Sequence, residues 1–289
     1  MLLLLLTMAV WGSTFVATKG LISVWPPFTL AFARVTIGTL VLLPLAVARY
    51  QPGMRLPWGT IWIMGAIGVA LYYLTFNVAM VHISASQGAL VQASIPAMTA
   101  LVAVLWLRER ASWQRWLGIA LSVSGVLIVF SGSAADDGNS SLFGSVLMFA
   151  SVVCWALYTS LAKRVAAHEP LVITACVTGT GAALLLPLSI YEVTTHALAQ
   201  LPVMSWLGVL YLGGIASGVA YLLYNVSLQH LDASEVGVYT NLIPIVGVIT
   251  GVVFLGEPLS IRAIVGGLVV MFGVWVTSRS DGRQPEVVT

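Results

Sequence analysis

Ten apolar stretches, separated by short polar connections, occupy most of this chain. A helix needs about 20 mainly apolar residues, rising 1.5 Å each, to cross the hydrocarbon core of a bilayer. Each stretch comes close to that length, so the pattern predicts ten membrane-spanning helices and leaves no room for a separate soluble domain. The predicted spans cover residues 2–21, 28–48, 59–81, 86–107, 113–131, 142–163, 170–191, 204–226, 234–256 and 262–278.

The composition supports a chain that folds in lipid. Only 8% of the 289 residues are charged and 59% are hydrophobic, whereas a soluble domain carries roughly 25% charged residues. So few charged side chains cannot cover a soluble globule, and we expect an all-α membrane protein. Cys154 and Cys176 lie inside apolar stretches, where a thiol packs as a small hydrophobic group, so we expect no disulfide and no metal site. No cofactor and no nucleic-acid partner are expected.

The first apolar stretch has two possible readings, a signal peptide or a retained span. It lacks a positively charged leading segment, and residues 2–20 continue through Trp11 and Phe15 without a clear cleavage site. We therefore expect an uncleaved first span. Basic residues are retained on the cytoplasmic side, and their distribution predicts cytoplasmic N- and C-termini in a bacterial inner membrane. The basic residues predicted to be cytoplasmic are Arg49, Arg55, Arg108, Arg110, Arg115, Lys163, Arg164, Arg279 and Arg283, against Lys19 and Arg262 outside.

The chain also repeats itself. Residues 77–126 align without gaps onto residues 225–274 at an offset of 148, and 14 of these 50 positions are identical. The matches include rare polar and helix-breaking residues, which two unrelated apolar runs would not align. Examples are Asn77 with Asn225, His82 with His230, Ser86 with Ser234, Pro96 with Pro244, and Glu109 with Glu257.

Each repeat unit contains five predicted helices, an odd number, so the second unit must cross the membrane upside down relative to the first. We predict a first five-helix repeat at residues 1–133, a linking loop at 134–138, a second, inverted repeat at 139–280, and a cytoplasmic tail at 281–289. Inverted repeats are typical of secondary transporters, whose substrate site lies near the membrane midplane between the halves. The sequence therefore predicts ten transmembrane helices around a central cavity.

Four short segments carry a family resemblance: WGSTFVATK at residues 11–19, AFARVTIGTL at 31–40, WLRERAS at 106–112 and FLGEPLS at 254–260. Their order resembles the EamA-type drug/metabolite transporter family over essentially the whole chain. The resemblance implies a ten-helix basket with two inverted halves, a cavity open to one side at a time, and export of amino acids or related metabolites. The positions that match its motifs are Trp11, Lys19, Arg34, Glu109 and Glu257.

Pro96 and Pro244 lie at the same place in the fourth and ninth predicted spans. A proline inside a helix removes one hydrogen bond and frees the carbonyl four residues earlier. Paired interruptions indicate a transport site, although a packing kink is an equally open interpretation. The polar side chains within a turn of these hinge prolines are the first candidate substrate-binding residues: Gln92, Ser94, Tyr239 and Asn241.

Arg34 is the only basic side chain well inside a predicted span. A charge within the membrane is costly and is usually paired or faces water. Arg34 could bind backbone carbonyls at an outer gate, which we favour slightly, or the carboxylate of a substrate, for which its planar fork is suited.

Aromatic residues recur at equivalent places in the two halves. Trp11 and Trp155 occupy comparable positions in the first helices of the halves, and each is followed eight residues later by a lysine. Together with Tyr73, Tyr158 and Tyr221 they are candidates to line the cavity, because such rings can stack on a ligand and hydrogen-bond it. Packing between helices is an equally open interpretation for each of them.

Glu109 and Glu257 fall at the ends of the fourth and ninth spans. With Lys19 they are candidate gate residues or loop ion pairs, Glu257 pairing with Arg262. No carboxylate lies deep in a span, so coupling to protons is not supported and a facilitator or exchanger fits better. Gly118, Gly125, Gly266 and Gly273 place small residues two turns apart on the fifth and tenth spans, for packing or a dimer contact.

We therefore predict a secondary transporter, an exporter or exchanger, for small polar metabolites such as amino acids. Its expected partners are that substrate and membrane lipid, and a homodimer with a second copy is an open alternative. An ATP-driven pump is excluded because the sequence contains no Gly-rich loop ending in Gly-Lys-Ser/Thr. The alternatives are an intramembrane enzyme acting on an amphiphilic substrate, and a purely structural membrane scaffold.

Overall fold

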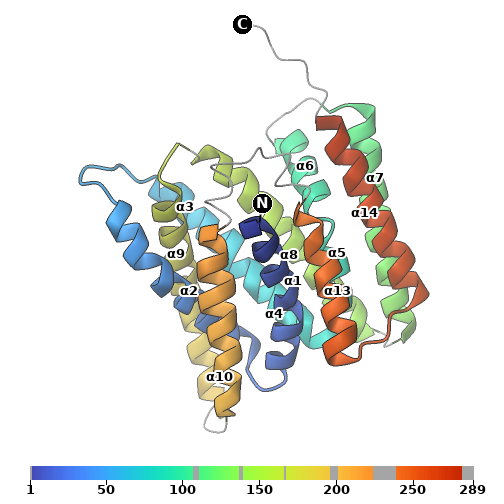
Figure 1. Ribbon diagram of the computed structural model, residues 1–289, viewed down its shortest axis with the longest axis horizontal. Helices are drawn as coiled ribbons and strands as arrows, with labels where there is room; N and C mark the ends of the chain where they lie inside the picture. The colour runs from blue at the N-terminus through green and yellow to red at the C-terminus, as the bar shows by residue number, and fades with distance from the viewer. Residues whose placement is uncertain are drawn as a thin grey trace, which may run out of the picture.

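The computed structural model describes residues 2–106, 111–136, 139–165, 167–195, 201–223 and 239–281. These residues form helices joined by short connections, with no strand among them (Figure 1). The helices are α1 (Leu2–Ile22), α2 (Pro27–Arg49), α3 (Trp58–Met64), η1 (Gly65–Leu71), α4 (Tyr72–His82), α5 (Ala85–Gln92), α6 (Ile95–Trp106), α7 (Trp113–Asp136), α8 (Asn139–Arg164), α9 (Pro170–Thr195), α10 (Val203–Leu210), η3 (Tyr211–Val219), α13 (Leu242–Leu255) and α14 (Ile261–Asp281).

The predicted spans are confirmed. Among the described residues, nine helical segments are long and apolar enough to cross a membrane, and α13 is a shorter apolar helix. The third span runs without interruption through α3, η1 and α4, and the fourth consists of α5 and α6. The predicted ninth span began at residue 234, which lies outside the described residues, and α13 covers its later part.

Helix contacts show that the two halves are related by an inverted repeat. The chain alternates between a lower face, where residues 19–27, 82–85 and 255–262 lie, and an upper face with residues 49–58 and 164–170 (Figure 1). In each half the first span contacts the fourth span of the other half, α1 with α13 and α8 with α6. In the same way the second span contacts the third span of the other half, α2 with η3 and α9 with η1. Three further pairs, α2 with α9, α7 with α14 and α5 with α13, join equivalent spans of the two halves. The counterpart of the remaining large pair, α4 with α8, falls mostly outside the described residues. This confirms ten helices in two inverted five-helix repeats.

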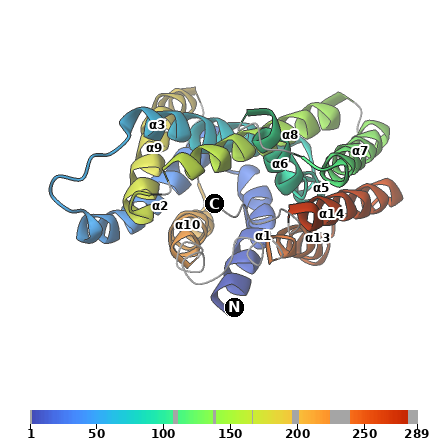
Figure 2. The same cartoon turned by 90° about the horizontal axis from the view of Figure 1, so that it is seen from above.

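Helices α7 and α14 lie side by side at one edge of the molecule (Figures 1 and 2). Their glycines face each other: a Cβ atom at Gly125 would lie 2.6 Å from the carbonyl oxygen of Gly266, and one at Gly273 would lie 2.7 Å from that of Gly118. The repeated glycines therefore allow close backbone packing between two helices of one chain, which is the packing role predicted for them.

We predict that Gly125→Ala lowers stability, because its methyl group would separate the two helices at a close backbone contact. The expected loss is roughly 1–3 kcal/mol, seen as a lower thermal transition in detergent. The matched control is Gly20→Ala on α1, where nothing lies within 4 Å of the added atom. This control should keep or raise the transition temperature, since alanine is more favourable than glycine within a helix by about 1 kcal/mol. Equal transitions for the two variants would contradict the packing role.

Candidate functional site

Aromatic rings from both halves meet at α1, α4 and α8, helices that lie in the middle of the molecule (Figure 1). Trp11 on α1 lies 5.4 Å from the Tyr221 ring, and Trp155 on α8 lies 5.1 Å from Tyr158 and 6.5 Å from Tyr221. Tyr72 connects this group to α4, because its ring is 5.3 Å from Trp155 and 4.9 Å from Tyr73. We call these residues the central aromatic cluster: Trp11, Tyr72, Tyr73, Trp155, Tyr158 and Tyr221.

The cluster follows the internal symmetry of the chain. Tyr73 and Tyr221 are separated by 148 residues, the offset of the sequence repeat. Each follows a π-helix, η1 or η3, at equivalent places in the third and eighth spans. π-Helical turns are rare and occur frequently at functional sites. The structure thus brings together all five aromatic candidates of the cavity, and adds Tyr72, which sequence reasoning missed.

Arg34 lies beside this cluster and is only 4% exposed. Its guanidinium carbon is 4.5 Å from the centre of the Tyr73 ring, and Nη1 lies 3.5 Å from the hydroxyl of Thr18. Its Nε is buried without a hydrogen-bond partner among the described residues. The acidic residues of the described ranges fall at helix ends or in loops: Asp136, Glu169, Glu192, Glu257 and Asp281. Arg34 therefore contacts a ring and a hydroxyl, and neither of the two predicted partners, backbone carbonyls or a substrate carboxylate, is seen beside it among the described residues.

Gln92 forms a polar connection between the halves next to the cluster. Its Oε1 lies 3.3 Å from the Tyr72 hydroxyl, and its Nε2 donates to Ser151 Oγ on α8 at 3.1 Å. The helix breaks just after Gln92, because α5 ends there and α6 begins at Ile95, immediately before Pro96. The Ser94 hydroxyl donates to the Val91 carbonyl at 2.7 Å, so it stabilises the break.

The equivalent break in the second half lies at Asn241, just before α13 and Pro244. Asn241 is half-buried and makes no side-chain capping bond there. Tyr239 packs with Leu4 and Met8 of α1, on the side of Trp11. Glu109, the remaining predicted gate residue, lies outside the described residues.

Lys19 and Glu257 close the corner between α4 and α5 at the lower face. Lys19 Nζ donates to the carbonyls of Met80 and Ile83 at 2.8 and 2.7 Å, at the carboxyl end of α4. The Glu257 carboxylate accepts from the backbone amides of Ala85 and Ser86 at 2.7 and 2.8 Å, and from the Ser86 hydroxyl at 2.7 Å. We call this set of contacts the lower-face clasp.

The lower-face clasp differs from the predicted loop ion pair. Arg262 donates to the Ser131 carbonyl at 3.1 Å, while Glu257 binds the amino end of a helix from the other half. A carboxylate at a helix amino end and an ammonium at a carboxyl end are each stabilised by the helix dipole. Glu257 also attracts Lys19 electrostatically. Lys19 and Glu257 therefore join three parts at one point: the end of α1, the corner between α4 and α5, and the second half.

A second carboxylate is buried at the same face. Glu192 on α9 is 5% exposed and accepts from the Thr29 amide and hydroxyl at 2.7 and 2.9 Å, at the start of α2. Asn77 donates to the Pro27 carbonyl at 2.9 Å. The lower face is thus held by several polar contacts between spans. The sequence marked Lys19, Asn77, Ser86 and Glu257 as motif or repeat residues, but it gave no signal for the Glu192 contact.

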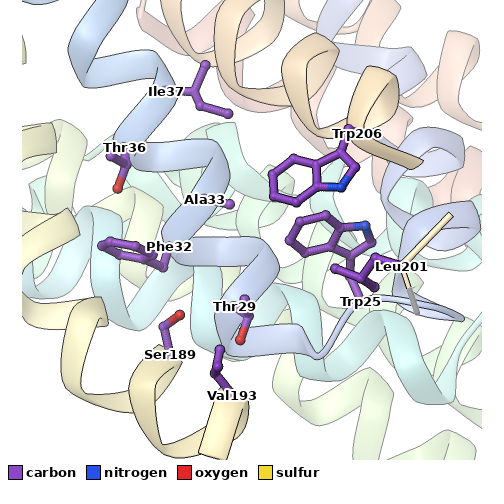
Figure 3. A pocket seen from close by; sticks show the side chains of 10 residues that line it. All are labelled: Trp25, Thr29, Phe32, Ala33, Thr36, Ile37, Ser189, Val193, Leu201 and Trp206. Carbon is purple, nitrogen blue, oxygen red and sulfur yellow. The ribbon is translucent and has the colours of Figure 1, made fainter. Parts of the chain in front are cut away.

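The described part of the chain also contains a pocket of about 480 Å³. It lies between α2, α9 and the start of α10, not at the central aromatic cluster (Figure 3). We call it the side pocket; its lining residues are Trp25, Thr29, Phe32, Ala33, Thr36, Ile37, Ser189, Val193, Leu201 and Trp206.

Ten apolar helices in two inverted halves, with aromatic and polar side chains of both halves at the centre, define a membrane transporter. The chain belongs to the EamA-like transporter family, which matches residues 1–131 and 142–279. The recognition of this family from the sequence is confirmed. Because it is a family of transporters, an intramembrane enzyme is no longer an alternative.

Relatives match the chain over nearly its whole length. An uncharacterized transporter of Archaeoglobus fulgidus is 25% identical, covering 96% of this chain and 98% of its own. A protein of Streptantibioticus cattleyicolor named "probable terminal-alkyne amino-acid exporter" is 27% identical, covering 99% and 96%. A solved crystal structure with 22% identity superposes with a TM-score of 0.68 and covers 96% of this chain and 97% of its own, which supports the fold.

We predict that Glu257→Gln lowers stability by about 1–3 kcal/mol, because the amide cannot replace a charged acceptor for three donors. Ser86→Ala should have a smaller effect, and the double variant should lose less than the sum of the two, since both remove one shared contact. Thermal unfolding in detergent measures all three. Arg262→Gln is the control and should change stability by less than about 1 kcal/mol, as for an exposed charge. If Arg262→Gln matched Glu257→Gln, the loop ion pair would be the correct interpretation.

Proposed function

We propose that this protein is a secondary transporter of amino acids or related carboxylate-bearing metabolites, which works by alternating access as an exporter or exchanger. The observation that carries the proposal is Arg34, a buried guanidinium beside the central aromatic cluster with no carboxylate at its depth among the described residues. A charge placed there is costly unless a partner compensates it. A substrate carboxylate supplies such a partner.

The surroundings of Arg34 fit a substrate that has an apolar part as well. The aromatic rings are half-buried, except for the more deeply buried Tyr73, so their faces can contact a ligand. Hydroxyl and amide groups of Tyr72, Gln92 and Ser151 lie next to them. The relative from Streptantibioticus cattleyicolor, named a probable terminal-alkyne amino-acid exporter, supports this substrate class for a related chain.

The lower-face clasp supports alternating access. It links the halves by contacts that one conformation can make and the other can release, as discrete switching between states requires. With both termini in the cytoplasm, as the basic residues predict, the lower face is the outer face of the plasma membrane. The described conformation would then be closed on the outside.

Among the described residues, no carboxylate lies in the central aromatic cluster. Glu192 and Glu257 bind helix amino ends at the lower face instead. Exchange or facilitated transport therefore remains the preferred mode within this proposal.

We predict that the wild-type protein prefers an amino acid over its carboxamide, and that Arg34→Gln removes this preference. A bidentate pair between guanidinium and carboxylate is roughly twice as strong as a neutral hydrogen bond, so the preference should be at least about tenfold. Counterflow of labelled amino acids into proteoliposomes, with unlabelled acid or amide as competitor, measures it.

The control for this prediction is Arg115→Gln, which removes another buried arginine, at the start of α7 and away from the aromatic rings. A purely structural role for Arg34 would lower transport of acid and amide together and leave their ratio unchanged. That result would contradict the carboxylate contact.

We predict that breaking the lower-face clasp opens that face. Ala89 is buried one turn beyond Ser86, so Ala89→Cys, with Cys154 and Cys176 replaced by serine, reports access from the lower face. Glu257→Gln should raise its labelling by a membrane-impermeant thiol reagent about tenfold, as expected for a shift of about 1.4 kcal/mol between two states. Arg262→Gln should leave labelling unchanged. Equal labelling in both variants would remove the clasp from the gating step.

A further inference from the structure

The side pocket lies apart from the central aromatic cluster and has a different character. Its walls are mostly carbon, and two of its polar groups bond within the protein, whereas the buried Thr36 hydroxyl has no hydrogen-bond partner among the described residues. The Thr29 hydroxyl donates to Glu192 at 2.9 Å, and the Trp25 indole donates to Ser205 at 2.9 Å. Because most of the lining is carbon, an apolar chain in the pocket would bury its surface mainly against other carbon atoms, which is favourable.

The depth of the side pocket corresponds to one leaflet of a bilayer. Thr29 and Ile37 line its two ends on α2, and eight residues of helix span roughly 12 Å, out of about 15 Å for half of a hydrocarbon core. Trp25 precedes α2 and Trp206 lies in the first turn of α10, so both belong to the lower end of these helices, and Figure 3 shows their rings close together, with centroids 4.7 Å apart. Tryptophan is enriched at the level of lipid headgroups, so this end lies where an acyl chain begins.

The rim of the side pocket continues into the lipid-facing surface. Val193 and Trp206 belong to the pocket and are 42% and 47% exposed. Large apolar side chains next to them are exposed too: Ile190, Val203, Met204 and Leu207. In a membrane-spanning chain such side chains face lipid tails, so the pocket opens directly onto the lipid.

We propose that the side pocket binds one acyl chain of a phospholipid from the leaflet at the lower face. The bound chain lies between α2 of the first half and α9 and α10 of the second, with its headgroup end at Trp25 and Trp206. This site is separate from the substrate site, and its occupation does not depend on which metabolite is transported.

The test is photolabelling in liposomes of phosphatidylethanolamine and phosphatidylglycerol that contain a trace of phosphatidylcholine with a diazirine in its acyl chain. Mass spectrometry locates the adducts. We expect residues 29–37 and 201–206 to be labelled several-fold more than residues 264–272 of α14, whose exposed side chains include Ile264, Leu268 and Phe272.

Two variants fill or block the pocket. Ala33→Phe occupies its wall and Val193→Trp closes its exposed rim, and each should reduce labelling of residues 29–37 by roughly tenfold, the effect of excluding about two methylene groups. Ala120→Phe on the lipid-facing side of α7 is the matched control and should change nothing. Unchanged labelling of residues 264–272 reports that each variant is folded.

Three outcomes would overturn the proposal. The first is wild-type labelling of the pocket no greater than that of α14. The second is labelling that neither Ala33→Phe nor Val193→Trp reduces. The third is loss of the pocket adducts when a saturating mixture of amino acids is added, because the pocket would then belong to the transport pathway. Counterflow measured on the same liposomes tests the proposed transport separately.

Discussion

The contacts at the lower face depend on one requirement: the backbone groups at the ends of successive spans need hydrogen-bond partners within the protein. A helix end leaves several amides or carbonyls without partners, and lipid offers none. At the corner between α4 and α5 the structure uses Lys19 for the carbonyls and Glu257 for the amides. Because α1 supplies one charge and the second half supplies the other, the requirement for capping becomes a connection between the halves.

The fold could be predicted from the sequence because length and hydropathy determine where a chain can cross lipid. The described helices begin and end within a few residues of the predicted spans. The inverted arrangement followed from the parity of five helices, and the contacts of α7 with α14 and α2 with α9 agree with it. The clasp could not be predicted, because Glu257 and Ala85 are 172 residues apart and each resembles an ordinary helix-end residue.

The candidate site was predictable where the internal repeat gave a second copy of a residue. Trp11, Trp155, Tyr73 and Tyr221 meet because equivalent helices of inverted halves face the same centre. Tyr72 has no such copy, since Ala220 stands at the repeat offset, and its role depends on the local rotation of the helix. The π-helix before it sets that rotation, and the sequence of η1 gives no signal for such a turn.

The two halves carry equivalent residues in unequal surroundings. Lys19 is half-buried and bound to α4, whereas Lys163, its counterpart eight residues after Trp155, is exposed. A symmetric pair of halves in a single resting state would give the two lysines the same environment. An inverted repeat that alternates between two states must instead hold one arrangement at each face and exchange them during the cycle. Under the alternating access proposed above, the half-buried Lys19 and the exposed Lys163 correspond to one state of the cycle, in which Lys19 holds the lower face.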